Sequence, residues 1–249
     1  MFSRALALYE PINSYKPVAP DIGIVDGPLE FMPWAGIRLP FTTRMTVVRL
    51  GDGGLLLHSP TRFDPTLAAQ LQTIGPIRHL VSPNRIHYAG IGNWSRAFPR
   101  ACCWASPRVR ERAKSQGIEV RFNRDLTADA PTDWNRDLVQ TLVPGSFMDE
   151  VVFFHLRSRT LVLADLIENF ELDKIRRPYR WIVRLAGAYH PHGQMPIDLR
   201  MTFRGHKDGV RRAVETMLAW QPERIILSHG RCIDRSAADA LRYAFRWAL

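Results

Sequence analysis

Two isolated histidines and one aspartate each follow an apolar run that is typical of a buried β-strand. His87 comes after IRHLV in the stretch SPNRIHYAG, Asp165 ends TLVLAD, and His229 lies in RIILSHG near the C-terminus. Parallel and mixed sheets gather such strand ends along one edge, so these residues can meet although they are far apart in sequence. Two imidazoles and a carboxylate suit a divalent metal, zinc above all, with a coordination position left open. The sequence therefore predicts a single-metal centre at these three residues.

Such a centre predicts hydrolysis of an unknown small-molecule substrate. Coordination can lower the pKa of a water molecule from about 16 to about 7. The resulting nucleophile would attack an ester, thioester, lactone, amide or phosphoester. Asp165 and Asn84 are the expected catalytic residues, and Asn84 and Ser146 would orient substrate or water. The competing hypothesis is that no metal binds, and that His87, Asp165 and His229 form a polar cluster that fixes three loops.

Other candidate residues are expected to be structural. His58 is expected to border the cleft, and the pair His190 and His192 is expected to be a polar loop. Ser59 and Ser228 lack the glycine-flanked turn of a serine nucleophile. The remaining histidines and the adjacent cysteines are expected in the core or in solvent: His79, His155, His206, Cys102 and Cys103.

Composition describes a globular protein with a basic surface. The chain has 249 residues, 46% of them hydrophobic, which is enough for a sizeable core. No stretch is long enough to cross a membrane, and MFSRALALYEP is too short for a secretory signal. Three cysteines cannot form a disulfide framework, so we expect a cytoplasmic location. The net charge is +10, but no nucleic-acid-binding motif accompanies it.

The stretch IRRPYRWIVRLAGA, residues 175–188, is basic and amphipathic, and residues 175–187 are its candidate membrane-binding part. Such an element can rest on an anionic membrane surface. The alternative is a helix that covers the cleft as a lid or wall, with its apolar side inward and its arginines in water. Pro178 interrupts the first turn and favours the alternative.

The order of elements predicts one main domain. Residues 1–35 are proline-rich and are expected to form an extended arm, and residues 36–249 are expected to form a single domain. Strands are expected over residues 38–50, 55–60, 77–81, 101–106, 119–122, 138–143, 150–156, 160–165 and 224–228. Helices are expected over residues 64–75, 107–117, 175–188, 207–220 and 236–248. Two mixed β-sheets packed face to face, with helices outside, fit this α/β pattern.

The elements and their strand-end residues resemble the metallo-β-lactamase superfamily, whose fold is an αββα sandwich. The resemblance spans the chain from about Arg38 to the C-terminus. The nearest match is a divergent branch classed as a domain of unknown function, through SPNRIHYAG, NWSRAFP, ACCWASP and the tail RIILSHG followed by ALRYAFRWA.

The superfamily's ligand motif is degenerate in this chain. In the family, one metal is held by three histidines, and the resemblance places Ser82, Asn84 and Ser146 at those positions. The second metal is held by an aspartate and two histidines, and here Ile86 replaces that aspartate. The bridging aspartate corresponds to Asp165, and the surviving histidines correspond to His87 and His229. The resemblance therefore implies loss of the first metal and at most one metal in the second site.

Two functions remain open on the sequence alone. The first is a metal-dependent hydrolase with one ion. The second is a non-catalytic descendant of the fold that binds a ligand or partner through the same cleft.

Overall fold

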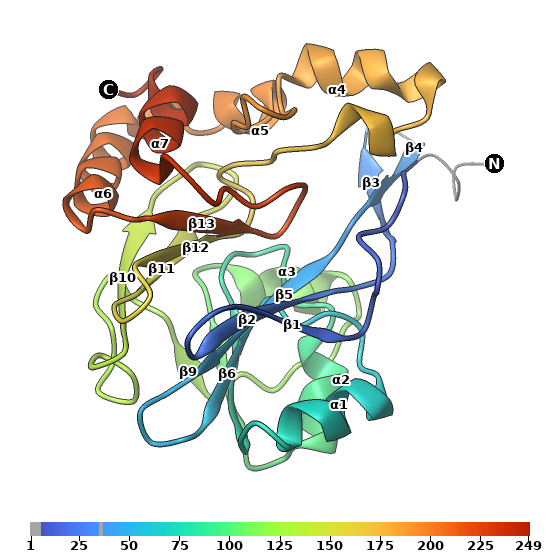
Figure 1. Cartoon of the computed structure of the whole chain (residues 1–249), viewed down its shortest axis with the longest axis vertical. Helices are drawn as coiled ribbons and strands as arrows, with labels where there is room; N and C mark the ends of the chain where they lie inside the picture. The colour runs from blue at the N-terminus through green and yellow to red at the C-terminus, as the bar shows by residue number, and fades with distance from the viewer. Residues whose placement is uncertain (1–5, 35–36) are drawn as a thin grey trace.

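The computed structural model describes residues 6–34 and 37–249 as two β-sheets packed face to face, with helices on both outer faces (Figure 1). This arrangement is the αββα sandwich that the sequence predicted. Figure 1 shows the larger sheet with α1, α2 and α3 in the lower half of the view, and the smaller sheet below α6 and α7.

The larger sheet has seven strands in the order β1-β2-β5-β6-β7-β8-β9 among the described residues. β6, β7, β8 and β9 run parallel to one another, whereas β5 runs antiparallel to β6. The strands of this sheet are β1 Tyr15–Ala19, β2 Ile22–Asp26, β5 Arg44–Arg49, β6 Leu55–His58, β7 Ile77–Ser82, β8 Cys102–Ala105 and β9 Arg124–Asp125.

The smaller sheet has four strands in the order β10-β11-β12-β13. β12 and β13 are parallel, which brings their carboxyl ends together. The strands are β10 Leu138–Val143, β11 Glu150–His155, β12 Thr160–Leu163 and β13 Arg224–Leu227, and β3 Glu30–Trp34 pairs with β4 Ile37–Phe41 in a separate hairpin.

Seven α-helices lie within the described residues. α1 begins after Asp64, whose side chain accepts a hydrogen bond from the backbone N–H of Leu67 as an N-cap. The helices are α1 Pro65–Gln72, α2 Ile91–Ala97, α3 Val109–Ser115, α4 Arg180–Ala186, α5 Ile197–Met201, α6 Lys207–Ala219 and α7 Ala237–Phe245, and short 3-10 helices cover Leu172–Lys174, Arg177–Tyr179 and Arg204–His206. Among these residues, no helix combines the length and apolarity needed to traverse a bilayer.

Side-chain alternation along the strands builds the layers. On β11, Val151 and Phe153 pack between the two sheets, whereas Val152 and Phe154 pack under α6 and α7. A third apolar cluster lies between the larger sheet and the helices α1, α2 and α3. β6 and β12 are buried along their whole length, which explains why their sequences are almost entirely apolar.

Two segments differ from the sequence-based expectations. Residues 119–122 form no strand, and a two-residue strand, β9, follows instead. Within the expected arm, β1 pairs with β2 and β2 pairs with β5, so both strands belong to the larger sheet. The expected domain boundary between residues 35 and 36, like residues 1–5 of the arm, lies outside the described residues, so the division stays a prediction.

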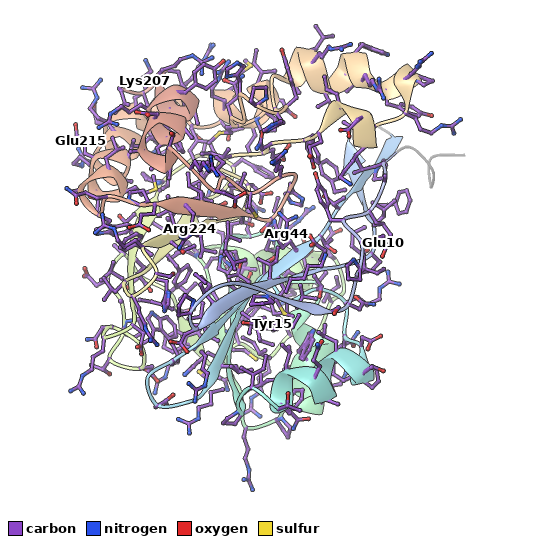
Figure 2. All side chains as sticks on the ribbon, viewed as in Figure 1. Glu10, Tyr15, Arg44, Lys207, Glu215 and Arg224 are labelled. Carbon is purple, nitrogen blue, oxygen red and sulfur yellow. The ribbon has the colours of Figure 1, made fainter. Side chains whose placement is uncertain are left out.

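The carboxyl ends of β6, β7, β12 and β13 and the amino end of β5 meet at one end of the sandwich. The register pairs Thr46 with His58 and Leu163 with Leu227, which fixes these ends side by side. Figure 2 places Arg44, the first residue of β5, near the centre of the molecule, whereas Lys207 and Glu215 lie on the outer helix α6. This end of the sandwich carries the residues that the sequence singled out.

Candidate metal centre

His87, Asp165 and His229 converge at the common end of the two sheets. The Nε2 atom of His87 lies 3.0 Å from Oδ2 of Asp165, and Nε2 of His229 lies 3.1 Å from Oδ1. One ligand atom from each of the three residues lies within 4.8 Å of the others. Ligands about 2.1 Å from a tetrahedral zinc lie ~3.4 Å apart, so small side-chain shifts would admit an ion.

The hydrogen bond at Nδ1 of His229 implies that a proton or a metal ion lies at its other ring nitrogen, Nε2. Its Nδ1 atom lies 2.6 Å from the backbone oxygen of Thr42, which can only accept, so Nδ1 carries the hydrogen. A neutral ring would then direct the lone pair of Nε2 at the carboxylate of Asp165. Only a proton or a cation between these atoms removes that repulsion. A histidine whose Nδ1–H binds a backbone carbonyl and whose Nε2 is free is also the usual form of a metal ligand.

His87 is held in the same way from its other nitrogen. The Oγ atom of Ser59, which follows β6, lies 2.5 Å from Nδ1 of His87. Ser59, His87 and Asp165 thus form a Ser–His–Asp chain, but its order is reversed, because in serine hydrolases Nε2 contacts the serine and Nδ1 the aspartate. Ser59 is also only 8% exposed. The contact fits a hydroxyl that orients the His87 ring better than a nucleophile.

Asp165 is fixed by two buried residues behind it. Asn84 is fully buried and donates its amide nitrogen to Oδ2 of Asp165 at 2.7 Å and to Oε2 of Glu150 at 2.9 Å. Its Oδ1 atom accepts the backbone N–H of Ile86. Glu150 accepts the backbone N–H groups of Ala164 and Asp165. Asn84 therefore positions Asp165, and its amide does not reach toward substrate or water as the sequence suggested.

Burial and the three charged groups shift the pKa values at this centre. Burial alone would raise the pKa of Asp165, but His87 and His229 outweigh it and hold that pKa far below its usual range. Burial alone would lower the pKa of His87, but the charge of Asp165 raises it. Burial, followed by the charge of Asp165, raises the pKa of Glu150 to about 7. The carboxylate of Asp165 is therefore the group that attracts a cation.

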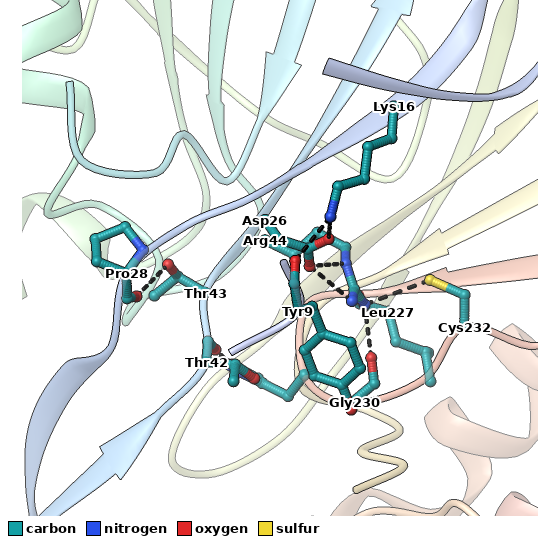
Figure 3. A network of polar contacts seen from close by, with 11 residues as sticks. Tyr9, Lys16, Asp26, Pro28, Thr42, Thr43, Arg44, Leu227, Gly230 and Cys232 are labelled. Carbon is teal, nitrogen blue, oxygen red and sulfur yellow. Dashed lines mark hydrogen bonds and ion pairs between the residues drawn. The ribbon is translucent and has the colours of Figure 1, made fainter. Parts of the chain in front are cut away.

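Arg44 fixes the loop that carries His229 (Figure 3). Its Nη1 atom donates to the backbone oxygens of Leu227 and Gly230, both at 2.7 Å. These two hydrogen bonds hold the loop on either side of His229. Its Nη2 atom lies 2.7 Å from Oδ1 of Asp26, in a pair whose side chains are 4% and 5% exposed. Thr42 and Arg44 thus orient His229 from the same end of β5.

Gly230 allows the loop after β13 to lie close to the backbone of Asn169. Its φ angle is +85°, and a Cβ atom there would lie 2.3 Å from the backbone carbon and oxygen of Asn169. The backbone nitrogen of Asn169 in turn donates to the backbone oxygen of His229. The His-Gly pair is therefore a packing requirement of this loop as well as part of the motif.

Two further buried titratable residues lie near the centre. His58, expected to border the cleft, is 2% exposed, and neither ring nitrogen has a hydrogen-bond partner among the described residues. Burial, with the nearby His87, lowers the pKa of His58 to about 3, so its ring is neutral. Burial also raises the pKa of Glu168 to about 8. Neither group has the placement of a ligand in this structure.

The positions that the resemblance assigns to a first metal hold no ligand cluster in the described part of the chain. Ser82 donates its Oγ to the backbone oxygen of Asn84. Ser146 is exposed, and its backbone contacts Thr202 and Arg108. Ile86 packs against the core beneath α6 and α7. These side chains leave only the set of His87, Asp165 and His229, the one cluster of metal-ligand type among the described residues.

The other histidines that the sequence analysis set aside contact residues outside the metal centre. His79 accepts from the indole of Trp104 at 3.2 Å. His155 pairs with Ser158, and His192 packs against the ring of Tyr243. The cysteines Cys102, Cys103 and Cys232 are unpaired.

Sequence reasoning missed Glu150 and Arg44. Each is a charged residue at the start of an apolar strand, in EVVFFH and RMTVVR. A charge inside a run that is otherwise buried was the available signal, because buried charges are rare unless they are paired.

A family model described as a domain of unknown function, DUF4336, matches residues 36–175, more than half of the chain. The chain belongs to the DUF4336 family. The DUF4336 match includes His87 and Asp165, whereas His229 lies beyond its end. No curated protein sequence matches the chain.

Several solved structures similar to this DUF4336 chain are metallo-β-lactamases. DIM-1 exposed to ceftazidime is 14% identical, with a TM-score of 0.62 and 98% of each chain covered. FIM-1 from Pseudomonas aeruginosa, in a mono-zinc form, is 15% identical, with a TM-score of 0.61 and coverage of 98% of this chain and 96% of that one. An enzyme from Pontibacter korlensis is 10% identical, with a TM-score of 0.60 and coverage of 94% and 98%. The likeness confirms the metallo-β-lactamase fold.

Proposed function

We propose that this DUF4336 protein is a hydrolase that uses one divalent metal ion, with zinc as the first candidate. The observation that carries the proposal is the commitment of His229 Nδ1 to the carbonyl of Thr42, which leaves Nε2 facing a carboxylate oxygen 3.1 Å away. That arrangement needs a metal ion or a proton at Nε2, and the proposal assigns the metal ion. The side chains of His87 and His229 are 11% and 9% exposed, so the cluster touches solvent and an ion can reach it.

His87, Asp165 and His229 would hold the ion. When bound, a divalent ion supplies a Lewis acid that lowers the pKa of a water molecule and polarises an acyl or phosphoryl oxygen. Thr42 and Ser59 fix the two imidazole rings, so that both direct Nε2 at one point. The substrate class is an ester, thioester, lactone, amide or phosphoester.

One ion rather than two fits the donor set. Serine and asparagine side chains at positions 82, 84 and 146 are poor zinc ligands. FIM-1, a protein of the same fold, is described in a mono-zinc form. That precedent supports a single-ion site on this fold.

The second candidate is a non-catalytic descendant that binds a ligand or partner. It is favoured by the closed network around Asp165, whose oxygens already contact Asn84, His87 and His229. In that case a proton on an imidazole supplies the positive charge, and the cluster serves only to join three loops.

Metal content separates the two functions. Protein expressed in zinc-supplemented medium should contain about one zinc ion per chain by mass spectrometry of the dissolved metal, and His229→Ala should contain almost none. His206→Ala is the matched control, because His206 is an exposed histidine outside the cluster and its loss should leave the zinc content unchanged. The zinc-loaded protein should hydrolyse at least one member of a panel of chromogenic esters, thioesters, lactones and phosphodiesters. Metal-free wild-type protein would refute the hydrolase and leave the second candidate.

A further inference from the structure

Four of the eight large hydrophobic side chains that are exposed among the described residues lie on two neighbouring short helices. These are Trp181 and Leu185 on α4, 58% and 71% exposed, and Ile197 and Met201 on α5, 46% and 57% exposed. Figure 1 shows α4 and α5 next to each other along the top of the molecule. We call these four side chains, with the arginines beside them, the α4–α5 surface.

The apolar side chains of α4 turn outward because of their spacing. Trp181, Arg184 and Leu185 are three and four residues apart, so they share one face of the helix, and all three are exposed. The opposite side of the helix is already occupied, since Val183 packs against a small cluster that contains Phe170 and Ile175. The sequence-based expectation of a lid with its apolar side inward is therefore wrong for Trp181 and Leu185.

Positive charge is concentrated on the same segment. Residues 172–206 contain seven lysines and arginines and two aspartates, so their net charge is +5. About one seventh of the chain length thus carries half of the net charge of +10. Arg176, Arg177, Arg184 and Arg204 are exposed. The α4–α5 surface is thus both apolar and basic.

A surface cavity continues this surface toward the N-terminal segment. It has a volume of about 720 Å³. Leu6, Leu8 and Leu29 line it on one side, and Lys174, Arg176, Arg177 and Arg180 line it on the other. This cavity therefore combines apolar and cationic side chains next to the first residue of α4.

These features select an anionic lipid bilayer as the partner. A second copy of the chain that docked through the same surface would bring like charges together, which opposes association. Tryptophan and leucine that insert at the headgroup boundary, with arginines that reach the phosphates, are the features of interfacial binding. We propose that the chain docks on anionic membranes through the α4–α5 surface, without spanning the bilayer.

Vesicle co-sedimentation tests the proposal on the full chain. At about 0.05 M NaCl the protein should sediment with vesicles of phosphatidylcholine and phosphatidylglycerol and remain in solution with phosphatidylcholine alone. Raising NaCl to about 0.5 M should release most of the bound protein, because the surface charges are then screened. Equal sedimentation with both vesicles, or none with either, would overturn the proposal.

Two pairs of variants locate the binding face. The double variant W181S/L185S should bind at least about tenfold more weakly, since it removes the inserting groups. L156A is its control, because Leu156 is 41% exposed in the turn between β11 and β12. The variant R177Q/R184Q should bind about fivefold more weakly for each charge removed. R100Q/R121Q removes the same charge from exposed positions near α2 and α3 and should bind nearly as wild type does.

Equal weakening by both arginine pairs would show attraction by net charge alone and would overturn the assignment to this surface. Size-exclusion chromatography without vesicles gives the second readout. Wild-type dimers that dissociate in W181S/L185S would identify a second copy of the chain as the occupant and refute the membrane. Far-UV circular dichroism and the thermal midpoint of each variant should match wild type, because these side chains project into solvent.

Discussion

The Nε2 atom of His229 lies 3.1 Å from Oδ1 of Asp165, and the other nitrogen of that ring already donates to a backbone carbonyl. Two acceptors thus face each other unless a positive charge lies between them. This relationship is the physical basis for expecting a metal at the common end of the two sheets. It also identifies the neighbouring residues whose replacement should change zinc affinity or stability.

Ser59→Ala should lower zinc affinity about 10- to 100-fold, because the His87 ring loses the hydroxyl that fixes its orientation. Isothermal titration of the metal-free protein with zinc measures this change. Ser95→Ala is the control, since its hydroxyl donates to the backbone of Gly92 within α2 and does not contact the centre. Unchanged zinc affinity, together with covalent labelling of Ser59 by a fluorophosphonate, would instead identify Ser59 as a nucleophile.

Gly230→Ala should destabilise the fold by about 3 kcal/mol or more and abolish zinc binding, because the new methyl group would collide with the backbone of Asn169. Gly117→Ala separates this collision from backbone strain. Gly117 also has a positive φ, +66°, but no atom lies within 4 Å of the position that its new methyl group would take, so the cost should be only about 1 kcal/mol. Urea denaturation measures both variants, and equal losses would contradict the close-packing argument.

Arg44→Met should destabilise the protein by about 3 kcal/mol, because Asp26 stays buried with only Lys16 as a partner and two backbone oxygens lose their donor. The variant should also bind zinc more weakly, since Arg44 fixes the loop of His229. Arg62→Met provides the comparison. Arg62 and Glu30 form an exposed pair, and its loss should cost less than about 1 kcal/mol. Similar destabilisation in the two variants would argue against a role for the buried network.

The metal-free protein should lose stability as pH rises from about 6.5 to about 8. The pKa of His87 is raised above 6.5, so its contribution is present below that pH and is lost as pH rises through the folded-state pKa. Glu150 and Glu168, whose pKa values rise from 4.5 to about 7 and about 8, act in the same direction. Asp165 acts oppositely but only in acid, since its pKa is lowered from 3.8. His58, His79 and His155 also act oppositely, because burial lowers their pKa values, but only below about pH 6.5.

Urea denaturation in the presence of a chelator measures this pH dependence. Glu168→Gln should flatten the decline, because the glutamine carries no charge to bury. Zinc affinity should follow the opposite trend and weaken in acid, since protons compete for the imidazole nitrogens. Metal-free protein that becomes more stable between about pH 6.5 and pH 8 would contradict the assignment of these shifts.

Much of the site could be predicted from the sequence, because apolar runs show where buried strands end. Apolar runs ending in His87, Asp165 and His229 predicted that the three would converge, and parallel pairing of β12 with β13 brings the last two together. The resemblance supplied the layer order, and the αββα fold confirms it.

The rest depended on tertiary contacts that a single sequence does not reveal. Nothing in RMTVVR shows that Arg44 reaches across to the loop after β13, a contact between residues 186 positions apart. The apolar face of α4 was expected to be buried, but Val183 and its neighbours fill that space and leave Trp181 outside. Residues 119–122 have the composition of a strand, but strand pairing with β8 begins only at Arg124.

A crystal structure of the zinc-soaked protein, with anomalous diffraction recorded at the zinc edge, tests the central claim most directly. The account predicts one anomalous peak about 2.0–2.2 Å from Nε2 of His87, Nε2 of His229 and a carboxylate oxygen of Asp165. An empty map at this point, with both imidazoles still hydrogen-bonded to Asp165, would contradict it.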